Sequence, residues 1–298
     1  MENLEIKQEN PEIEEVSLDE IEETPDENPS LVKDYFVKEN DLATKELASL
    51  FGQSEFELQK EFGTYKAKKI YKKLNLFIDD NYLHKDGIIS KLRLAVKYGF
   101  YGVSVYPSLI PISKTVLKGS DVKVRALVNF PHGGDVYKVI KYSLKQAVEL
   151  GADEIIISVS SYEIKNGELK EIAKKYKKLL KYSRKKAVSL SLDAQSLTIA
   201  EIESAVCALS SIDISSIIVC LNSGVDKNLI ESVVSAVAGR EYVEFHSDVC
   251  SAEDAVSVLL GGVNVLSTPL CEQVVLDLNK KINTTGCQAT ETVDKLSE

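Results

Sequence analysis

A cysteine, a histidine and an aspartate each lie at or near the end of a short run rich in valine, isoleucine and leucine. These are Cys220, His246 and Asp193, side-chain types that can act together as nucleophile, base and orienting acid. The other interpretation is structural, because free cysteines are commonly buried as inert apolar groups. We favour it, and we expect Cys220 to fill space while His246 forms a polar pair with Glu244.

Glu244, His246 and Asp248 alternate along one run, so that their side chains fall on one face of a strand. Imidazole and carboxylate groups can bind a metal ion, but a single histidine beside two acids is a weak pattern. The cysteines add nothing to it, because their number is odd and no CxxC pair occurs. They are Cys207, Cys220, Cys250, Cys271 and Cys287. The sequence therefore predicts no metal and no other cofactor, and it favours a reducing compartment.

The elements that would position these residues alternate regularly from Leu74 onward. Short β-branched runs predict strands at 75–79, 102–106, 122–128, 154–160, 187–192, 216–221, 242–246 and 263–267. Amphipathic runs predict helices at 86–98, 109–118, 134–150, 167–186, 198–210, 226–239, 251–260 and 270–281.

Such alternation requires parallel strands with helices packed outside them. Eight strand–helix units can close into a barrel that has no edge strand. The main competitor is an open doubly wound sheet, which would carry a glycine-rich GxGxxG turn after its first strand, and none follows 75–79. The predicted fold is therefore α/β, a (β/α)8 TIM barrel.

The carboxyl ends of the strands form the mouth of such a barrel, where ligands bind. Because side chains alternate between the interior and the exterior along a strand, Asn222 points inward if Cys220 does. The same alternation brings several polar side chains to the mouth, namely Asp79, Asp193, Cys220, Glu244 and His246. We expect them to line a pocket for a small molecule.

The runs, taken in order, resemble the deoxyribose-phosphate aldolase family, whose members are class I aldolases on a (β/α)8 barrel. The similarity is strongest at 97–134 and 147–160, and weaker at 77–86, 191–202 and 259–268. Together these stretches keep register with all the predicted strands. Aldolases of this kind form a Schiff base between the substrate carbonyl and a lysine of the sixth strand. A second lysine, on the seventh strand, lowers the pKa of the first.

All three catalytic positions that the resemblance implies are changed. Cys220 stands at the nucleophilic lysine, Glu244 at the second lysine and Ile156 at a proton-relay aspartate. A thiol converts a carbonyl only to a hemithioacetal, which has no nitrogen cation to accept the electrons of a breaking carbon–carbon bond. Glu244 would raise, not lower, the pKa of a neighbouring amine. The resemblance thus implies a catalytically degenerate barrel with a binding, regulatory or assembly role.

The phosphate site that the resemblance implies has changed as well. Ser247 and Asp248 stand where the family has a glycine pair after strand seven, and Leu266 stands where it has a small residue after strand eight. Asp248 would repel a phosphate. Two acids remain at family positions, because Asp79 matches an aspartate after strand one and Asp193 replaces a glutamate after strand five. The expected ligand-binding residues are Asn222, Ser247, Asp248 and Ser267.

Two enzymatic alternatives stay open at this point. The barrel would be an active carbon–carbon lyase of the deoxyribose-phosphate aldolase type if a different lysine formed the Schiff base. It would be a repurposed enzyme if Cys220 and His246 carried a new reaction. Fold similarity by itself does not choose between these alternatives and the degenerate barrel.

Charge is distributed unevenly along the chain. Residues 1–29 hold twelve acids, one base and no aromatic residue, whereas the net charge of all 298 residues is −10. We predict that 1–29 is a disordered acidic tail. A helical extension at 30–73, the barrel at 74–282 and a polar C-terminal tail at 283–298 are predicted to follow. The segment 170–186 has the opposite character, with nine bases and one acid.

A solvated helix face explains the basic segment 170–186 most simply. Among functional interpretations, docking of the acidic tail is favoured over nucleic acid, because the opposite charges are already on one molecule. Assembly into a homo-oligomer is a further expectation. No apolar run approaches the roughly 20 residues that cross a bilayer, and the amino terminus lacks the pattern of a secretory signal. We therefore expect a cytoplasmic protein.

Overall fold

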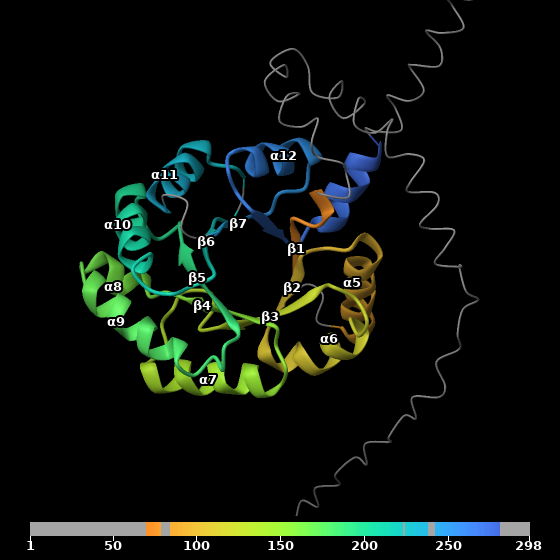
Figure 1. Ribbon diagram of the computed structural model, residues 1–298. Coiled ribbons are helices and arrows are strands. Elements are labelled where there is room, and N and C mark those ends of the chain that lie inside the picture. The colour runs from red at the N-terminus through yellow and green to blue at the C-terminus, as the bar shows by residue number, and fades with distance from the viewer. Residues whose placement is uncertain (1–69, 79–83, 223, 238–241, 281–298) are drawn as a thin grey trace, which may run out of the picture. The chain divides into compact units, whose positions relative to one another are not determined.

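The computed structural model describes residues 70–78, 84–222, 224–237 and 242–280 (Figure 1). Within them, eight parallel strands pair in the order in which they occur along the chain, and β1 pairs with β8 to close a barrel. Helices surround the strands on the outside (Figure 1). The chain therefore folds as the predicted (β/α)8 barrel.

All eight predicted strands are present. They are β1 (Leu74–Phe77), β2 (Gly102–Val105), β3 (Lys123–Val128), β4 (Glu154–Ser158), β5 (Ala187–Asp193), β6 (Ser216–Cys220), β7 (Tyr242–His246) and β8 (Val265–Thr268). The described helices are α5 (Lys85–Tyr98), α6 (Ile110–Val116), α7 (Tyr137–Glu149), α8 (Ser161–Lys165), α9 (Leu169–Leu180), α10 (Ile199–Leu209), α11 (Lys227–Val237) and α12 (Ala252–Leu260). Residues 271–280 are helical too.

Local signals explain some of the helix ends. Thr198 and Glu201 form the capping box at the start of α10 that their spacing indicates. Gly99 ends α5 in the left-handed conformation, with φ of 64°, which a residue without Cβ adopts readily. The predicted helix at 167–186 was too long, since α9 ends at Leu180. Arg184 and Lys185 have positive φ values of 50° and 67°, which a right-handed helix cannot contain.

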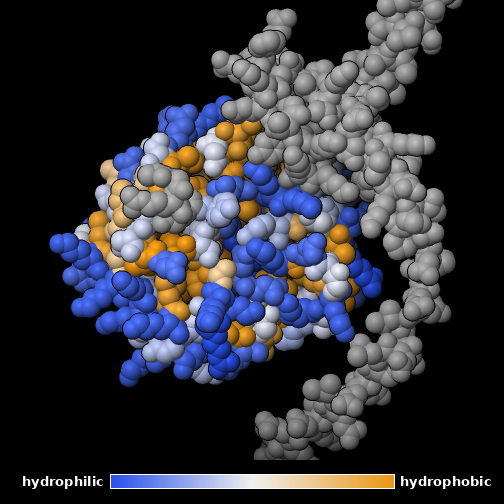
Figure 2. Space-filling model, viewed as in Figure 1, coloured by the Kyte–Doolittle hydropathy of each residue, from blue (hydrophilic) through white to orange (hydrophobic). Residues whose placement is uncertain are grey.

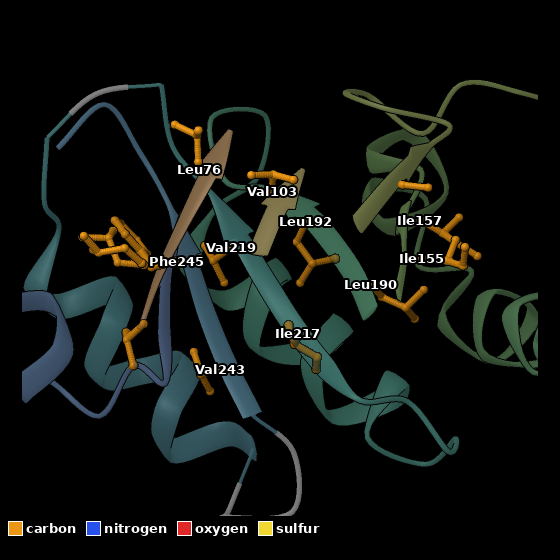
Figure 3. Close-up of a cluster of buried hydrophobic side chains, with 14 of the residues drawn as sticks. Leu76, Val103, Ile155, Ile157, Leu190, Leu192, Ile217, Val219, Val243 and Phe245 are labelled. Atoms are coloured by element: carbon orange, nitrogen blue, oxygen red, sulfur yellow. The ribbon is translucent and has the colours of Figure 1, made fainter. Parts of the chain in front are cut away.

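Alternate strand residues have different surroundings. Outward-facing strand residues pack under the helices in the main apolar core, among them Leu76, Val103, Ile155, Ile157, Leu190, Leu192, Ile217, Val219, Val243 and Phe245 (Figure 3). A separate and smaller apolar cluster occupies part of the barrel interior, and it consists of Phe77, Leu127, Ile156 and Ile218 with Tyr106, Phe130 and Cys220 around them. The barrel interior is therefore packed by side chains of its own.

No helix in the described ranges is long and apolar enough to cross a membrane. The predicted acidic tail, nearly all of the helical extension at 30–73 and the polar tail at 283–298 lie outside the described residues. Asp79 and Cys287 lie outside them as well.

Candidate functional site

A buried cation lies at the centre of the barrel interior. Arg125, on β3, has no solvent-exposed side-chain surface. Its Nε donates to Oε2 of Glu154 on β4 at 2.9 Å, and its Nη2 donates to Oε1 of Glu244 on β7 at 2.7 Å. The two carboxylates are 7% and 2% exposed. One guanidinium thus joins three strands across the interior, with charge-assisted hydrogen bonds on both sides.

Hydroxyl groups extend this network on the β5 and β6 side. The Oγ of Ser216 donates to Oε1 of Glu244 at 2.5 Å and lies 2.6 Å from Oγ of Ser189. The expected polar pair between Glu244 and His246 was therefore wrong. Glu244 faces the buried guanidinium of Arg125, which carries a full positive charge. The imidazole of His246, two residues further along the strand, contacts other groups.

The amino-terminal end of the barrel holds a second cation. Lys123, on β3, donates to Oε1 of Glu154 at 2.5 Å and to the hydroxyl of Tyr101 at 3.1 Å, and its side chain is 41% exposed. Burial would lower the pKa of Lys123, but these hydrogen bonds and the Glu154 charge outweigh it and raise the pKa. Burial alone would raise the pKa of Glu154, but Arg125 and Lys123 lower it. These groups stay charged at neutral pH.

The carboxyl-terminal end of the interior is apolar and aromatic. Phe77, on β1, packs against the ring of Phe130 with centroids 5.3 Å apart, and against the imidazole of His246 at 4.5 Å. Ile156 and Ile218 belong to the same cluster. The position that the resemblance assigns to a proton-relay aspartate is therefore part of this apolar packing.

Cys220 and His246 are paired in register on β6 and β7, and both are partly buried. Burial, with added repulsion from Asp193 and Glu244, raises the pKa of the Cys220 thiol to about 12. Burial lowers the pKa of His246 to about 4, and its Nδ1 lies 3.2 Å from Oγ of Ser267. Both groups are therefore neutral at pH 7, and the thiol is not activated.

Asp193 faces His132 and not His246. Its Oδ2 lies 3.3 Å from Nδ1 of His132 and accepts from Oγ of Ser196 at 2.6 Å, and its Oδ1 accepts from the backbone N–H of Gln195 at 3.1 Å. His132 belongs to the FPHGG turn and is 77% exposed. The carboxylate is thus held by the loop after β5. Cys220, His246 and Asp193 do not form a hydrogen-bonded chain of nucleophile, base and acid.

Comparison with known proteins agrees with this fold and these sequence runs. The chain is 39% identical to the deoxyribose-phosphate aldolase of Streptococcus pneumoniae serotype 19F over 101 residues. These residues make up 33% of this chain and 46% of that protein. A putative deoxyribose-phosphate aldolase from Coccidioides immitis superposes with a TM-score of 0.68 at 15% identity, over 72% of this chain and 87% of that one. This chain is a TIM barrel that resembles the deoxyribose-phosphate aldolases.

The fold likeness extends to a second aldolase. The deoxyribose phosphate aldolase of Aeropyrum pernix superposes with a TM-score of 0.64 at 16% identity, over 76% of this chain and 99% of that one. The sequence match is shorter, since the chain spans about half the length of the curated relatives it matches. No family model matches the chain.

The aldolase-like barrel uses most of its candidate ligand-binding residues internally. Ser247 is buried and donates to the carbonyl oxygen of Gly224 at 2.6 Å, and Ser267 accepts from the amide of Asn75 at 2.9 Å. Asn222 is exposed and donates to Oε1 of Gln195 at 2.5 Å. Asp248 is exposed after β7. Of this set, Ser267 lies beside His246 at the interior, and the other three belong to loops.

In the described part of the chain, no three histidine, cysteine, aspartate or glutamate side chains are arranged to hold a metal ion. Sequence reasoning missed Arg125 and Glu154 as members of the site, and it interpreted His132 as a turn residue without pairing it with Asp193. For Arg125 a signal was present, because Lys123, Arg125 and Leu127 alternate within one β-branched run and must share a face of the strand. An arginine on the inward face of a barrel strand requires a buried counter-charge.

Proposed function

We propose that this barrel is a catalytically degenerate relative of deoxyribose-phosphate aldolase, with a binding, regulatory or assembly role in the cytoplasm. The observation that carries the proposal is the buried pair of Arg125 and Glu244. The Glu244 carboxylate stands where the family resemblance implies the second lysine, and it accepts a hydrogen bond from the buried Arg125. A Schiff base needs an uncharged amine next to the substrate carbonyl. The family position of the nucleophilic lysine holds the neutral thiol of Cys220 instead.

The alternative in which another lysine forms the Schiff base has little structural support. Among the described strand residues, Lys123 is the single lysine, and it lies at the amino-terminal end of β3, opposite the mouth. Its hydrogen bonds to Glu154 and Tyr101 raise its pKa, so it is an ammonium group at neutral pH and not a nucleophile. The alternative that uses Cys220 is disfavoured by the raised pKa of the thiol.

The ligand expected for this role is a small molecule without a phosphate. Asp193 is held at the mouth, and Asp248 follows β7. Both carboxylates disfavour an anion at this end of the barrel. A homo-oligomer is part of the same proposal, because the related Aeropyrum pernix enzyme is described as a tetramer.

Borohydride trapping tests the proposal directly. The purified protein is incubated with deoxyribose 5-phosphate or acetaldehyde, reduced with borohydride and analysed by peptide mass spectrometry. We expect no adduct on any lysine. The Cys220→Lys variant is the matched control, because it returns an amine to the mouth, and we expect a reduced adduct at position 220. An adduct on a lysine of the unaltered chain, with sugar cleavage lost on mutating that lysine, would refute the degenerate assignment.

A further inference from the structure

The two halves of the barrel carry opposite charge. Residues 70–186, from β1 to the end of α9, hold 23 bases and eleven acids, whereas residues 187–280, from β5 to the last described helix, hold three bases and thirteen acids. Because the strands pair in chain order around a closed barrel, each half forms one side of it (Figure 1). Hydrophilic side chains crowd the surface over α7, α8 and α9 (Figure 2). The barrel is therefore nearly neutral as a whole but strongly polarised across its axis.

The positive half carries a row of lysines on α9. Ile172, Tyr176 and Leu179 are buried on one side of this helix, and they fix its rotation against the barrel. The other side is exposed and has lysines at three- and four-residue steps, so that successive turns place them next to one another. These lysines form the lysine ridge, which consists of Lys170, Lys174, Lys177, Lys178 and Lys181. None of them forms an ion pair with a described residue.

The negative half carries an open groove between α10 and α11. The groove has a volume of about 610 Å³, and Glu203 on α10 and Glu231 on α11 are part of its lining. Neither carboxylate forms an ion pair with a described residue. The rest of the lining is uncharged and mostly small, namely Cys207, Asn228, Ser232, Ser235 and Ala236. This acidic groove therefore has room for long side chains and negative charge to attract cationic ones.

The lysine ridge and the acidic groove both face outward from the barrel, and no ion pair joins them within one molecule. We propose that the lysine ridge of one barrel docks in the acidic groove of a second copy of this chain. The proposal rests on the homo-oligomer proposed above and names its interface. The aliphatic stems of the lysines would pack along the small side chains of the groove while their ammonium groups pair with Glu203 and Glu231.

A second copy fits these surfaces better than a nucleic acid does. A polyanion would use the lysine ridge alone, and the thirteen acids of the other half would repel it. A second copy uses both surfaces at once. Tyr162 adds to the ridge, because it is 74% exposed on α8, which packs against α9, and tyrosine is a common anchor of protein interfaces. Since two different surfaces meet, repetition of the contact forms a ring or a chain of copies.

Charge reversal on the two surfaces tests this interface in the full-length protein. One variant changes every lysine of the ridge to glutamate, and the other combines Glu203→Lys with Glu231→Lys. In analytical ultracentrifugation at about 0.1 M salt, the unaltered chain should sediment as an oligomer, and each variant should associate at least about tenfold more weakly. A mixture of the two variants should associate again, because the unaltered ridge of the second meets the unaltered groove of the first. Circular dichroism checks that both variants are folded.

The outcomes separate this interface from the proposals on which it rests. A monomer at about 0.1 M salt would overturn both the interface and the homo-oligomer. An oligomer that neither variant weakens, or two folded variants that do not associate when mixed, would overturn the interface alone. Dissociation of the oligomer on nuclease treatment would overturn it in favour of a nucleic acid. The missing Schiff base is tested separately by borohydride trapping.

Cys207 gives a second readout, because it is exposed and belongs to the lining of the acidic groove. At about 0.1 M salt, iodoacetamide should modify Cys207 more slowly as the protein concentration rises, since docking covers the groove. Cys250 is the matched control, because it is exposed and lies outside the groove lining. Near 1 M salt, where the Debye length is about 3 Å, both cysteines should react at rates independent of concentration. Unprotected Cys207 in a sample that sediments as an oligomer would overturn the interface.

Discussion

Replacing Arg125 with methionine removes the cation that joins two buried carboxylates. Glu154 keeps its hydrogen bonds with Lys123 and Tyr101. Glu244 keeps only the hydroxyl of Ser216, and its Oε2 has no hydrogen-bond partner among the described residues. Because the Glu244 side chain is only 2% exposed, water cannot replace the lost arginine, and a buried carboxylate without its cation costs free energy.

The expected cost follows from this geometry. Breaking a buried ion pair by removing one partner costs about 3–5 kcal/mol. For a barrel of this size that corresponds to a fall in Tm of about 6–20 °C, at roughly 2–4 °C per kcal/mol. The Arg125→Met, Glu244→Leu double variant should recover about 2 kcal/mol relative to the sum of the single variants, because both charges leave the interior together.

Urea denaturation followed by circular dichroism measures these free energies of unfolding. Lys123→Met is the matched control, since its side chain is 41% exposed and its loss should cost less than about 1 kcal/mol. If Arg125→Met costs no more than Lys123→Met, or if the two single changes are additive, the interior pair does not hold the barrel as described.

Three further outcomes are expected. Iodoacetamide should modify the exposed Cys207 and Cys250 at pH 8 while Cys220 stays unmodified, because burial raises the pKa of the Cys220 thiol to about 12. Mass spectrometry measures the labelling of each cysteine, and fast labelling of Cys220 would contradict this expectation. The pKa of His246 is about 4 in the folded state and near 6.5 in an unfolded chain. The unfolded state therefore binds the proton first, and stability should fall between about pH 6.5 and pH 4 by up to about 3 kcal/mol. His246→Gln should flatten that part of the stability curve, and an unchanged slope would rule out His246 as its source. Gly133→Ala should destabilise by more than about 2 kcal/mol in thermal denaturation, because its φ is +71° and a Cβ would lie 2.4 Å from the carbonyl carbon of Val159. Gly134→Ala, where a Cβ meets nothing within 4 Å, should change little, and equal effects would contradict the close approach.

The strands of this barrel could be predicted because each one is specified by its own residues. A run such as EIIIS or SIIVC is buried on both faces, so it reads as a continuous apolar segment bounded by polar residues. Helix ends were harder where like charges are crowded. The basic run after Leu180 has helical composition, yet the chain turns there with Arg184 and Lys185 at positive φ. Composition does not encode that turn.

The interior network could not be predicted in the same way. Arg125 contacts Glu154, 29 residues away, and Glu244, 119 residues away, so the pairing depends on the closure of the barrel. The partner of Asp193 was missed for the same reason, since His132 lies 61 residues earlier in a loop. Sequence identifies which residues face inward, because alternation along a strand is local. It does not identify which inward residues meet across the interior.

The interior pair also constrains how the chemistry of this barrel could change. Arg125 is fully buried with two carboxylates, which balance its charge together with that of Lys123. A lysine at position 244 would place a second cation against Arg125 in a site that excludes water. This would cost more folding free energy than an uncharged residue at the same position. Cys220 stands above this network as a neutral thiol. An amine pair of the aldolase type therefore requires concerted changes at Cys220, Glu244 and Arg125.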